Sequence, residues 1–233
     1  MAAYALGELE DARAVKPLAQ MLGADDPDTR AAAAAALGEI EDIRATDRLA
    51  PLVGDRESRV RLAAVHALGE IEDHRATGAL IAALRDKDVS VRRAAVQALG
   101  EVEDPKAAGP LAQAMDDGDM VVQRLAAQSL GELDNLKRAP ARLMSALSDS
   151  DPELRVIAAM SLGEIGDSAG VPASSTAYAG AEPRFRYAIV KALAETEDRR
   201  GDVVLVLAAK DKDQAIRHTA PEALKDRRED DDD

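Results

Sequence analysis

Residues 88–104 read Asp-Val-Ser-Val-Arg-Arg-Ala-Ala-Val-Gln-Ala-Leu-Gly-Glu-Val-Glu-Asp, and the Leu-Gly-Glu near the end of this stretch recurs along the chain. Seven copies begin at Leu6, Leu37, Leu68, Leu99, Leu130, Leu162 and Leu193, the last with alanine in place of the glycine. Successive copies lie 31 residues apart, except for one interval of 32. A repeat of this length is typical of solenoids, in which each unit buries its apolar face against its neighbours.

Each repeat reads as two helices. Apolar residues at helical spacing predict a first helix over Ala14 to Leu22 and a second over Pro27 to Leu37. Asp26 before Pro27 is a typical helix start, because aspartate accepts from free N–H groups and proline lacks one. We expect the glycine after each terminal leucine to adopt the left-handed conformation that ends many helices. The sequence therefore predicts an all-α, right-handed superhelix of about seven helical hairpins.

The pattern Asp-x-x-Val-Arg-x-Ala-Ala-x-x-Ala-Leu-Gly-Glu-Ile-Glu-Asp resembles the HEAT-like repeats of the phycobilin-lyase type, and residues 88–104 match it closely. The resemblance implies an α-α superhelix and covers nearly the whole chain. Members of this family serve mostly as binding scaffolds; some act as bilin lyases and some as metal-dependent hydroxylases. We expect one solenoid over residues 1–226, followed by a disordered acidic tail over 227–233.

The composition limits the kinds of partner. The formal net charge is −14, which disfavours nucleic acid, and the chain has no cysteine and three histidines, which leaves little for a metal centre. No apolar stretch approaches a membrane span and no signal peptide is evident, so we expect a soluble cytoplasmic protein. Asp outnumbers Glu, 27 to 17, and Arg outnumbers Lys, 22 to 8. This balance is similar to that of proteins from halophilic microbes, archaea included; an ordinary acidic protein is the alternative.

Two sets of charged residues recur along the repeats and are interpreted as scaffold. An acid at the start of each second helix, such as Asp88, precedes a base by four residues, here Arg92, except that Gln123 takes the place of the base once. This spacing predicts an i,i+4 ion pair, or a ladder that links neighbouring repeats. The glutamate of each Leu-Gly-Glu, such as Glu70, recurs because the turn recurs.

Three positions of each second helix, spaced i, i+3 and i+7, share one face but differ from repeat to repeat. A varied face is not needed for stacking, and the resemblance places it on the concave surface. It carries five basic residues against three acidic ones, so we expect an acidic or phosphorylated protein segment to bind there. The predicted binding residues are Arg59, Leu62, His66, Arg93, Gln97, Arg124, Gln128, Val156, Met160, Arg184, Tyr187 and Lys191. Solvated surface residues without a partner are the alternative.

The sixth repeat and both ends depart from the pattern. Glycine, proline and serine oppose a regular helix across Ser168 to Pro183, where Ser174 replaces a core leucine. This segment forms either a hinge or a pocket, or Tyr178 and Phe185 fill the space that its smaller side chains leave. The chain begins inside a second helix, at residues 1–6, and Pro221 is expected to kink the last one.

The residues argue against catalysis. The repeated His-Glu dipeptides of the metal-dependent hydroxylases are missing, since His66, His74 and His218 precede Ala, Arg and Thr. A DNA glycosylase needs a basic surface with aromatic residues against the flipped base, but this chain is acidic and has no tryptophan. A bilin lyase or chromophore-binding protein is the remaining alternative, although only Tyr187 would line its pocket. We therefore predict a non-enzymatic interaction scaffold with no catalytic residue, metal or cofactor, whose oligomeric state the sequence leaves open.

Overall fold

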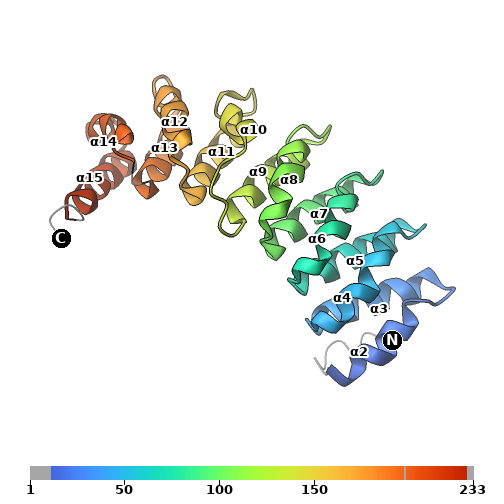
Figure 1. The fold of residues 1–233 in the computed structure, drawn as a ribbon. Helices are drawn as coiled ribbons and strands as arrows, with labels where there is room; N and C mark the ends of the chain where they lie inside the picture. Colours follow the sequence, from blue (N-terminus) through green and yellow to red (C-terminus); the bar gives the residue numbers. More distant parts are fainter. Residues whose placement is uncertain (1–11, 197, 230–233) are drawn as a thin grey trace. The chain divides into compact units, whose positions relative to one another are not determined.

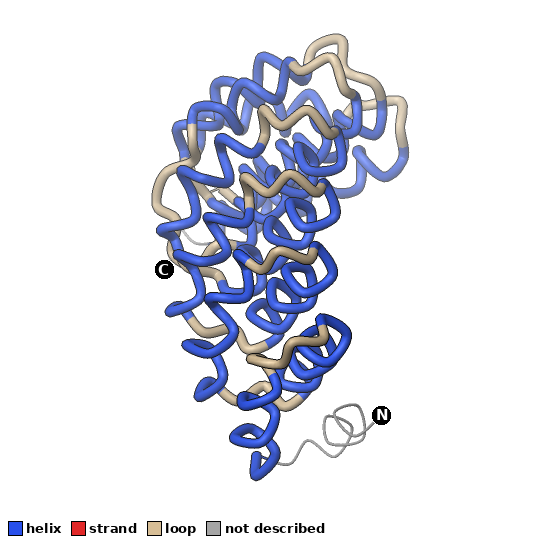
Figure 2. The backbone as a smooth tube through the Cα atoms, turned by 90° about the vertical axis from the view of Figure 1, so that its right-hand side faces the viewer, coloured by secondary structure: helices blue, strands red, loops and turns tan. Residues whose placement is uncertain are grey.

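A computed structural model describes residues 12–196 and 198–229, and side chains up to Lys225. Within these residues the chain forms α-helices and short 3-10 helices joined by loops, with no strand (Figure 2). The helix expected at residues 1–6 and the end of the acidic tail, 230–233, lie outside the described residues. The all-α prediction is confirmed.

The chain divides into two compact units, Met1–Ser129 and Leu130–Asp233, with the boundary inside α9. The predicted single solenoid over 1–226 stays a prediction, and each unit is described by itself. The first helices of the repeats are α2 (Val15–Met21), α4 (Thr46–Leu49), α6 (Thr77–Ala83) and α8 (Ala108–Ala114), then α10 (Ala141–Ser145), α12 (Val171–Tyr178) and α14 (Asp202–Ala208). The second helices are α3 (Pro27–Glu39), α5 (Ser58–Glu70), α7 (Val89–Val102) and α9 (Met120–Glu132), then α11 (Pro152–Ile165), α13 (Pro183–Glu195) and α15 (Gln214–Glu229).

Second helices pack side by side within each unit. In the first unit α5 lies between α3 and α7, and the first helices α2, α4 and α6 form a separate layer (Figure 1). In the second unit α13 lies between α11 and α15. The leucine of each Leu-Gly-Glu anchors this packing: Leu37, Leu68 and Leu99 are fully buried. The apolar spacing read from the sequence therefore does face the core.

The glycine of Leu-Gly-Glu has another role than the one expected. Gly38 and Gly69 lie inside α3 and α5, and the left-handed residues come three positions later, at Glu41 and Glu72. A Cβ on Gly38 would lie 2.8 Å from the Cα of Ala67 in the next second helix. The glycine is therefore required because two helix backbones approach closely, and not because it ends a helix.

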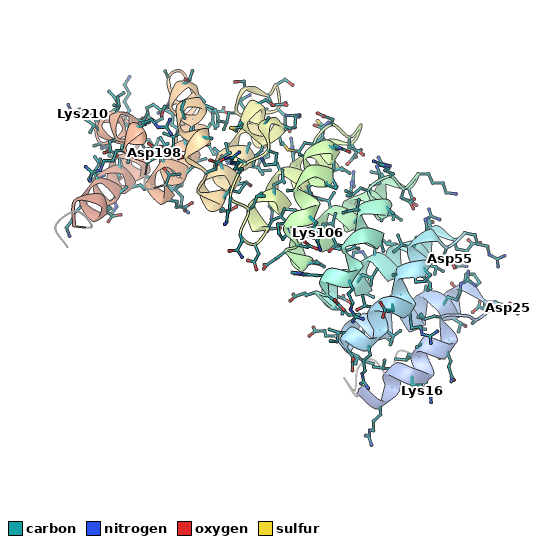
Figure 3. All side chains as sticks on the ribbon, viewed as in Figure 1. Lys16, Asp25, Asp55, Lys106, Asp198 and Lys210 are labelled. Carbon is teal, nitrogen blue, oxygen red and sulfur yellow. The ribbon has the colours of Figure 1, made fainter. Side chains whose placement is uncertain are left out.

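The recurrent acid and base do not pair with each other as i,i+4 neighbours. Asp88 instead caps α7, accepting from the backbone N–H of Ser90 at 2.9 Å. Arg92 reaches the next repeat, where its Nε and Nη2 donate to both oxygens of Asp117 at 2.8 and 2.9 Å. The ladder between repeats is thus the correct alternative, and the acid that receives Arg92 lies 25 residues further along the chain, as Asp55 (labelled in Figure 3) does for Arg30.

The sixth repeat keeps its first helix despite its glycines, proline and serines. Pro172 lies in the first turn of α12, where a missing N–H does no harm. Tyr178 and Phe185 are buried, which favours the space-filling interpretation. Pro221 lies inside α15, which continues to Glu229, so residues 227–229 are helical where a disordered tail was expected.

Candidate functional site

The varied face of the first unit is carried by α5, α7 and α9. Arg59 and His66, at i and i+7 of α5, are exposed, and Leu62 between them is half-buried. In the same columns of α7, Arg93 is half-buried and Gln97 is exposed. The equivalent residues of α9 are Arg124, which is half-buried, and Gln128, which is exposed. These seven predicted residues therefore all reach the surface of one unit.

In the second unit α11 and α13 carry the same face. Arg184 and Lys191 are exposed, and Met160 and Tyr187 are large apolar side chains that are 43% and 38% exposed. Val156 is an exception, because it is only 6% exposed and packs in the core. The prediction that Val156 binds a partner is therefore corrected: the position that is half-buried at Leu62 of α5 is buried in α11.

Carboxylates of adjacent repeats neutralise most of the basic residues on this face. Arg59 pairs with Asp28 at 2.5 Å, Arg93 with Asp119 at 2.6 Å and Arg184 with Glu153 at 2.7 Å. The hydrogen bond from Arg93 lowers the pKa of the Asp119 carboxyl to about 2. The positive charge counted from the sequence is therefore held in ion pairs within the protein.

A row of glutamates shares this face and was assigned to the turn in the sequence interpretation. Glu39, Glu70 and Glu101 are exposed at the ends of α3, α5 and α7. Each lies 11 residues after the first varied position, which is three helical turns and thus the same stripe of the helix. The prediction from the sequence considered only the positions that vary between repeats, so it overlooked these glutamates, although their spacing places them on the same face. The face has arginines toward the helix starts and glutamates toward the helix ends.

Burial and like charges act on this glutamate row. Desolvation, followed by the charges of Glu101 and Glu39, raises the pKa of Glu70, while His66 opposes the shift. In the second unit burial and the charges of Glu195 and Glu132 raise the pKa of Glu164. The ionised form of these carboxylates is therefore disfavoured by folding.

Glu70→Gln is consequently expected to raise the thermal midpoint of unfolding at pH 7. Because the pKa of Glu70 is raised in the folded state, its ionisation lowers stability at neutral pH, and the cost disappears as pH falls through the folded pKa. The gain of the variant should therefore shrink toward acidic pH in scans by circular dichroism. Glu72→Gln removes a charge from the same turn outside the row and is the control. An equal gain from both variants would indicate only the effect of net charge.

Among the described residues, no group of three His, Asp or Glu side chains is arranged to hold a metal ion. In the same part of the chain, no helix combines the length and apolar character needed to cross a membrane.

Solved structures share this architecture. YibA of Escherichia coli is 20% identical with a TM-score of 0.66, covering 96% of this chain and 85% of that one. An engineered protein is 21% identical with a TM-score of 0.62, covering 97% and 71%. The complex of CpcE and CpcF of phycocyanin lyase from Nostoc sp. PCC7120 is 26% identical with a TM-score of 0.52, covering 88% and 86%. No curated protein matches the sequence significantly.

HEAT repeats match residues 1–69, 49–131 and 110–174, which together span most of the chain. The matched segments include the Leu-Gly-Glu motifs from Leu6 to Leu162 and the helices α2 to α11. The chain therefore belongs to the HEAT-repeat family.

Proposed function

We propose that the protein is a non-enzymatic scaffold that binds an acidic or phosphorylated protein segment along the second-helix face of its first unit. The segment would cross the N-terminal halves of α5 and α7, where Arg59 and Arg93 lie, and avoid the glutamate row at the helix ends. The observation that carries the proposal is the contrast between two classes of arginine in this unit.

In the first unit, Arg30 and Arg61 of the ladder are buried, whereas Arg59 of the face is exposed and Arg93 is half-buried. The side chains of Arg61 and Asp86 are 6% and 9% exposed, but those of Arg59 and Asp28 are 53% and 72% exposed. An exposed pair contributes only about 0 to 1 kcal/mol, so a partner's anionic group can replace Asp28 at little cost. Arg59 thus remains available to a phosphate.

The spacing of the helices suggests the probe. Packed helices lie about 8–10 Å apart, and an extended chain advances about 3.3 Å per residue, so adjacent helices match every third residue of a segment. A labelled peptide with phosphoserine at every third position should bind in fluorescence polarisation. The same peptide with unmodified serine should not bind, and binding should weaken as salt is added.

Charge-reversal variants test the location. Arg59→Glu with Arg93→Glu should weaken phosphopeptide binding at least about tenfold, because charge-assisted hydrogen bonds are replaced by repulsion. Arg56→Glu with Arg85→Glu, at two exposed arginines of the loops, makes the same change of net charge outside the face. The proposed site would be refuted if both double variants lost phosphopeptide affinity equally. It would also be refuted if the serine peptide bound as tightly as the phosphoserine peptide.

A second candidate function is chromophore handling, which the likeness to the CpcE and CpcF structure favours. The exposed Met160 and Tyr187 of the second unit would then contact an apolar tetrapyrrole. Adding a bilin should shift its visible absorption, and Tyr187→Ala should reduce the shift. An unchanged spectrum would rule this candidate out.

A further inference from the structure

The ladder between repeats is irregular at two joints: Gln123 replaces the arginine at one, and the acid is missing at the other. Four arginines each donate Nε and Nη2 to both oxygens of an aspartate 25 residues ahead: Arg30 to Asp55, Arg61 to Asp86, Arg92 to Asp117 and Arg186 to Asp211. Arg155 occupies the same column in the second unit, but residue 180 is glycine. The acid that the pattern requires is therefore missing from the sequence at this joint.

Arg155 nevertheless keeps the orientation of the other arginines. Its Nη1 donates to the carbonyl of Asp149 at 2.9 Å, as Nη1 of Arg61 does to Asp55 at 3.0 Å. Its guanidinium carbon lies 5.6 Å from the centre of the Phe185 ring. Nη2 has one longer contact, 3.2 Å to Oε1 of the half-exposed Glu182. Nε has no hydrogen-bond partner among the described residues.

Arg155 lines a pocket of about 690 Å³, a volume typical of small-molecule sites. Met144, Ala173 and Ala177 supply apolar, partly exposed walls, and Gly180 forms part of the rim. The corresponding pocket of the first unit, about 510 Å³, is lined by Arg61 together with the Asp86 that neutralises it. The second unit thus combines a larger pocket with an incompletely paired arginine.

We propose that this pocket binds a small monocarboxylate with an apolar body. The carboxylate would accept from Nε and Nη2 of Arg155, reproducing the two-point contact that aspartate makes in the four regular joints. The apolar body would lie against Met144, Ala173 and Ala177. Asp149 and Glu182 also line the pocket, and their charge favours a single negative charge over a phosphate dianion.

Benzoate is a suitable probe, and the Nε–H resonance of Arg155 in heteronuclear NMR reports on the proposed contact. Benzoate should shift this resonance in a saturable way and bind more tightly than acetate, which lacks the apolar body. Benzamide, the neutral analogue, and inorganic phosphate should not shift it. Binding of phosphate as tight as that of benzoate would mean a general anion site and would overturn the proposal.

Two variants locate the site. Gly180→Asp restores the missing acid: nothing lies within 4 Å of a Cβ at this position, although a side chain at φ +88° strains the backbone. It should weaken benzoate binding at least about tenfold, since it occupies Arg155. Arg155→Gln should weaken binding similarly.

The first unit supplies the matched control, Arg61→Gln, which leaves the pocket of the second unit intact. Benzoate should bind this variant as it binds the parent protein. Undiminished binding in Gly180→Asp and Arg155→Gln would place benzoate elsewhere and refute the inference. The benzoate test is independent of the phosphopeptide test, which concerns α5 and α7 of the first unit.

Discussion

Replacing Asp86 with alanine is expected to lower the free energy of unfolding by about 3 kcal/mol, because removing one partner of a buried ion pair leaves the other charge uncompensated. Nε and Nη2 of Arg61 donate to Asp86 at 2.6 and 2.8 Å, and both side chains are buried. The Asp86 carboxylate also accepts from the backbone N–H of Asp88, so its loss disturbs the start of α7 as well.

Asp28→Ala is the matched control, since it breaks an exposed pair with Arg59 and should cost less than about 1 kcal/mol. Urea denaturation followed by circular dichroism measures both losses. Burial alone would raise the pKa of Asp86, but hydrogen bonds from Arg61 and from the backbone lower it. The stabilisation is therefore present above the pKa of an unfolded aspartate and is lost as pH falls through the folded pKa. Similar losses for the two variants at pH 7 would contradict the distinction between buried and exposed pairs.

Gly38→Ala is expected to destabilise the protein by about 2 kcal/mol, because overpacking forces two well-packed helices apart. The new Cβ would meet the Cα of Ala67 at 2.8 Å, and a backbone atom cannot move aside as a flexible side chain can. The higher helix propensity of alanine, worth up to about 1 kcal/mol, acts in the opposite direction.

Gly78→Ala isolates that propensity effect. Gly78 lies in α6 of the same unit with nothing within 4 Å of an added Cβ, so alanine should stabilise the protein there. Chemical denaturation of the two variants should give changes of opposite sign. A stabilised Gly38→Ala protein would show that α3 and α5 do not approach as closely as described.

The periodicity of the sequence predicted the helices well, because leucine and alanine at helical spacing have few ways to be buried. The predicted start of a second helix at Pro27 is where α3 begins, and Asp26 accepts from Thr29 there as expected. The bonding partner of the recurrent arginine was harder to predict. An acid four residues away and an acid 25 residues away are both consistent with the sequence, and only the stacking of repeats brings the second within 3 Å.

The candidate site was predicted less well than the fold. Helical spacing placed Arg59 and Arg93 correctly at the surface, but it gave no information about their carboxylate partners in other repeats. Val156 was misplaced because helical spacing does not tell how deeply a position at the edge of the face is covered: this position is half-buried at Leu62 and buried at Val156. The irregularity at Gly180 was visible in the sequence only after the 25-residue link was known, since the link defines which position lacks its acid.

A ladder arginine such as Arg30 donates hydrogen bonds both to its own loop and to the next hairpin, so the folding of one hairpin depends on the next. Arg30 holds its own loop through the carbonyl of Ala24 and the following hairpin through Asp55, whose carboxylate also fixes the backbone N–H of Glu57. Melting of one hairpin therefore releases an anchor in its neighbour, which is nearest-neighbour coupling in a one-dimensional array. Within the second unit, amide hydrogen exchange should reveal the weakest coupling between α11 and α13, where Gly180 interrupts the chain of anchors.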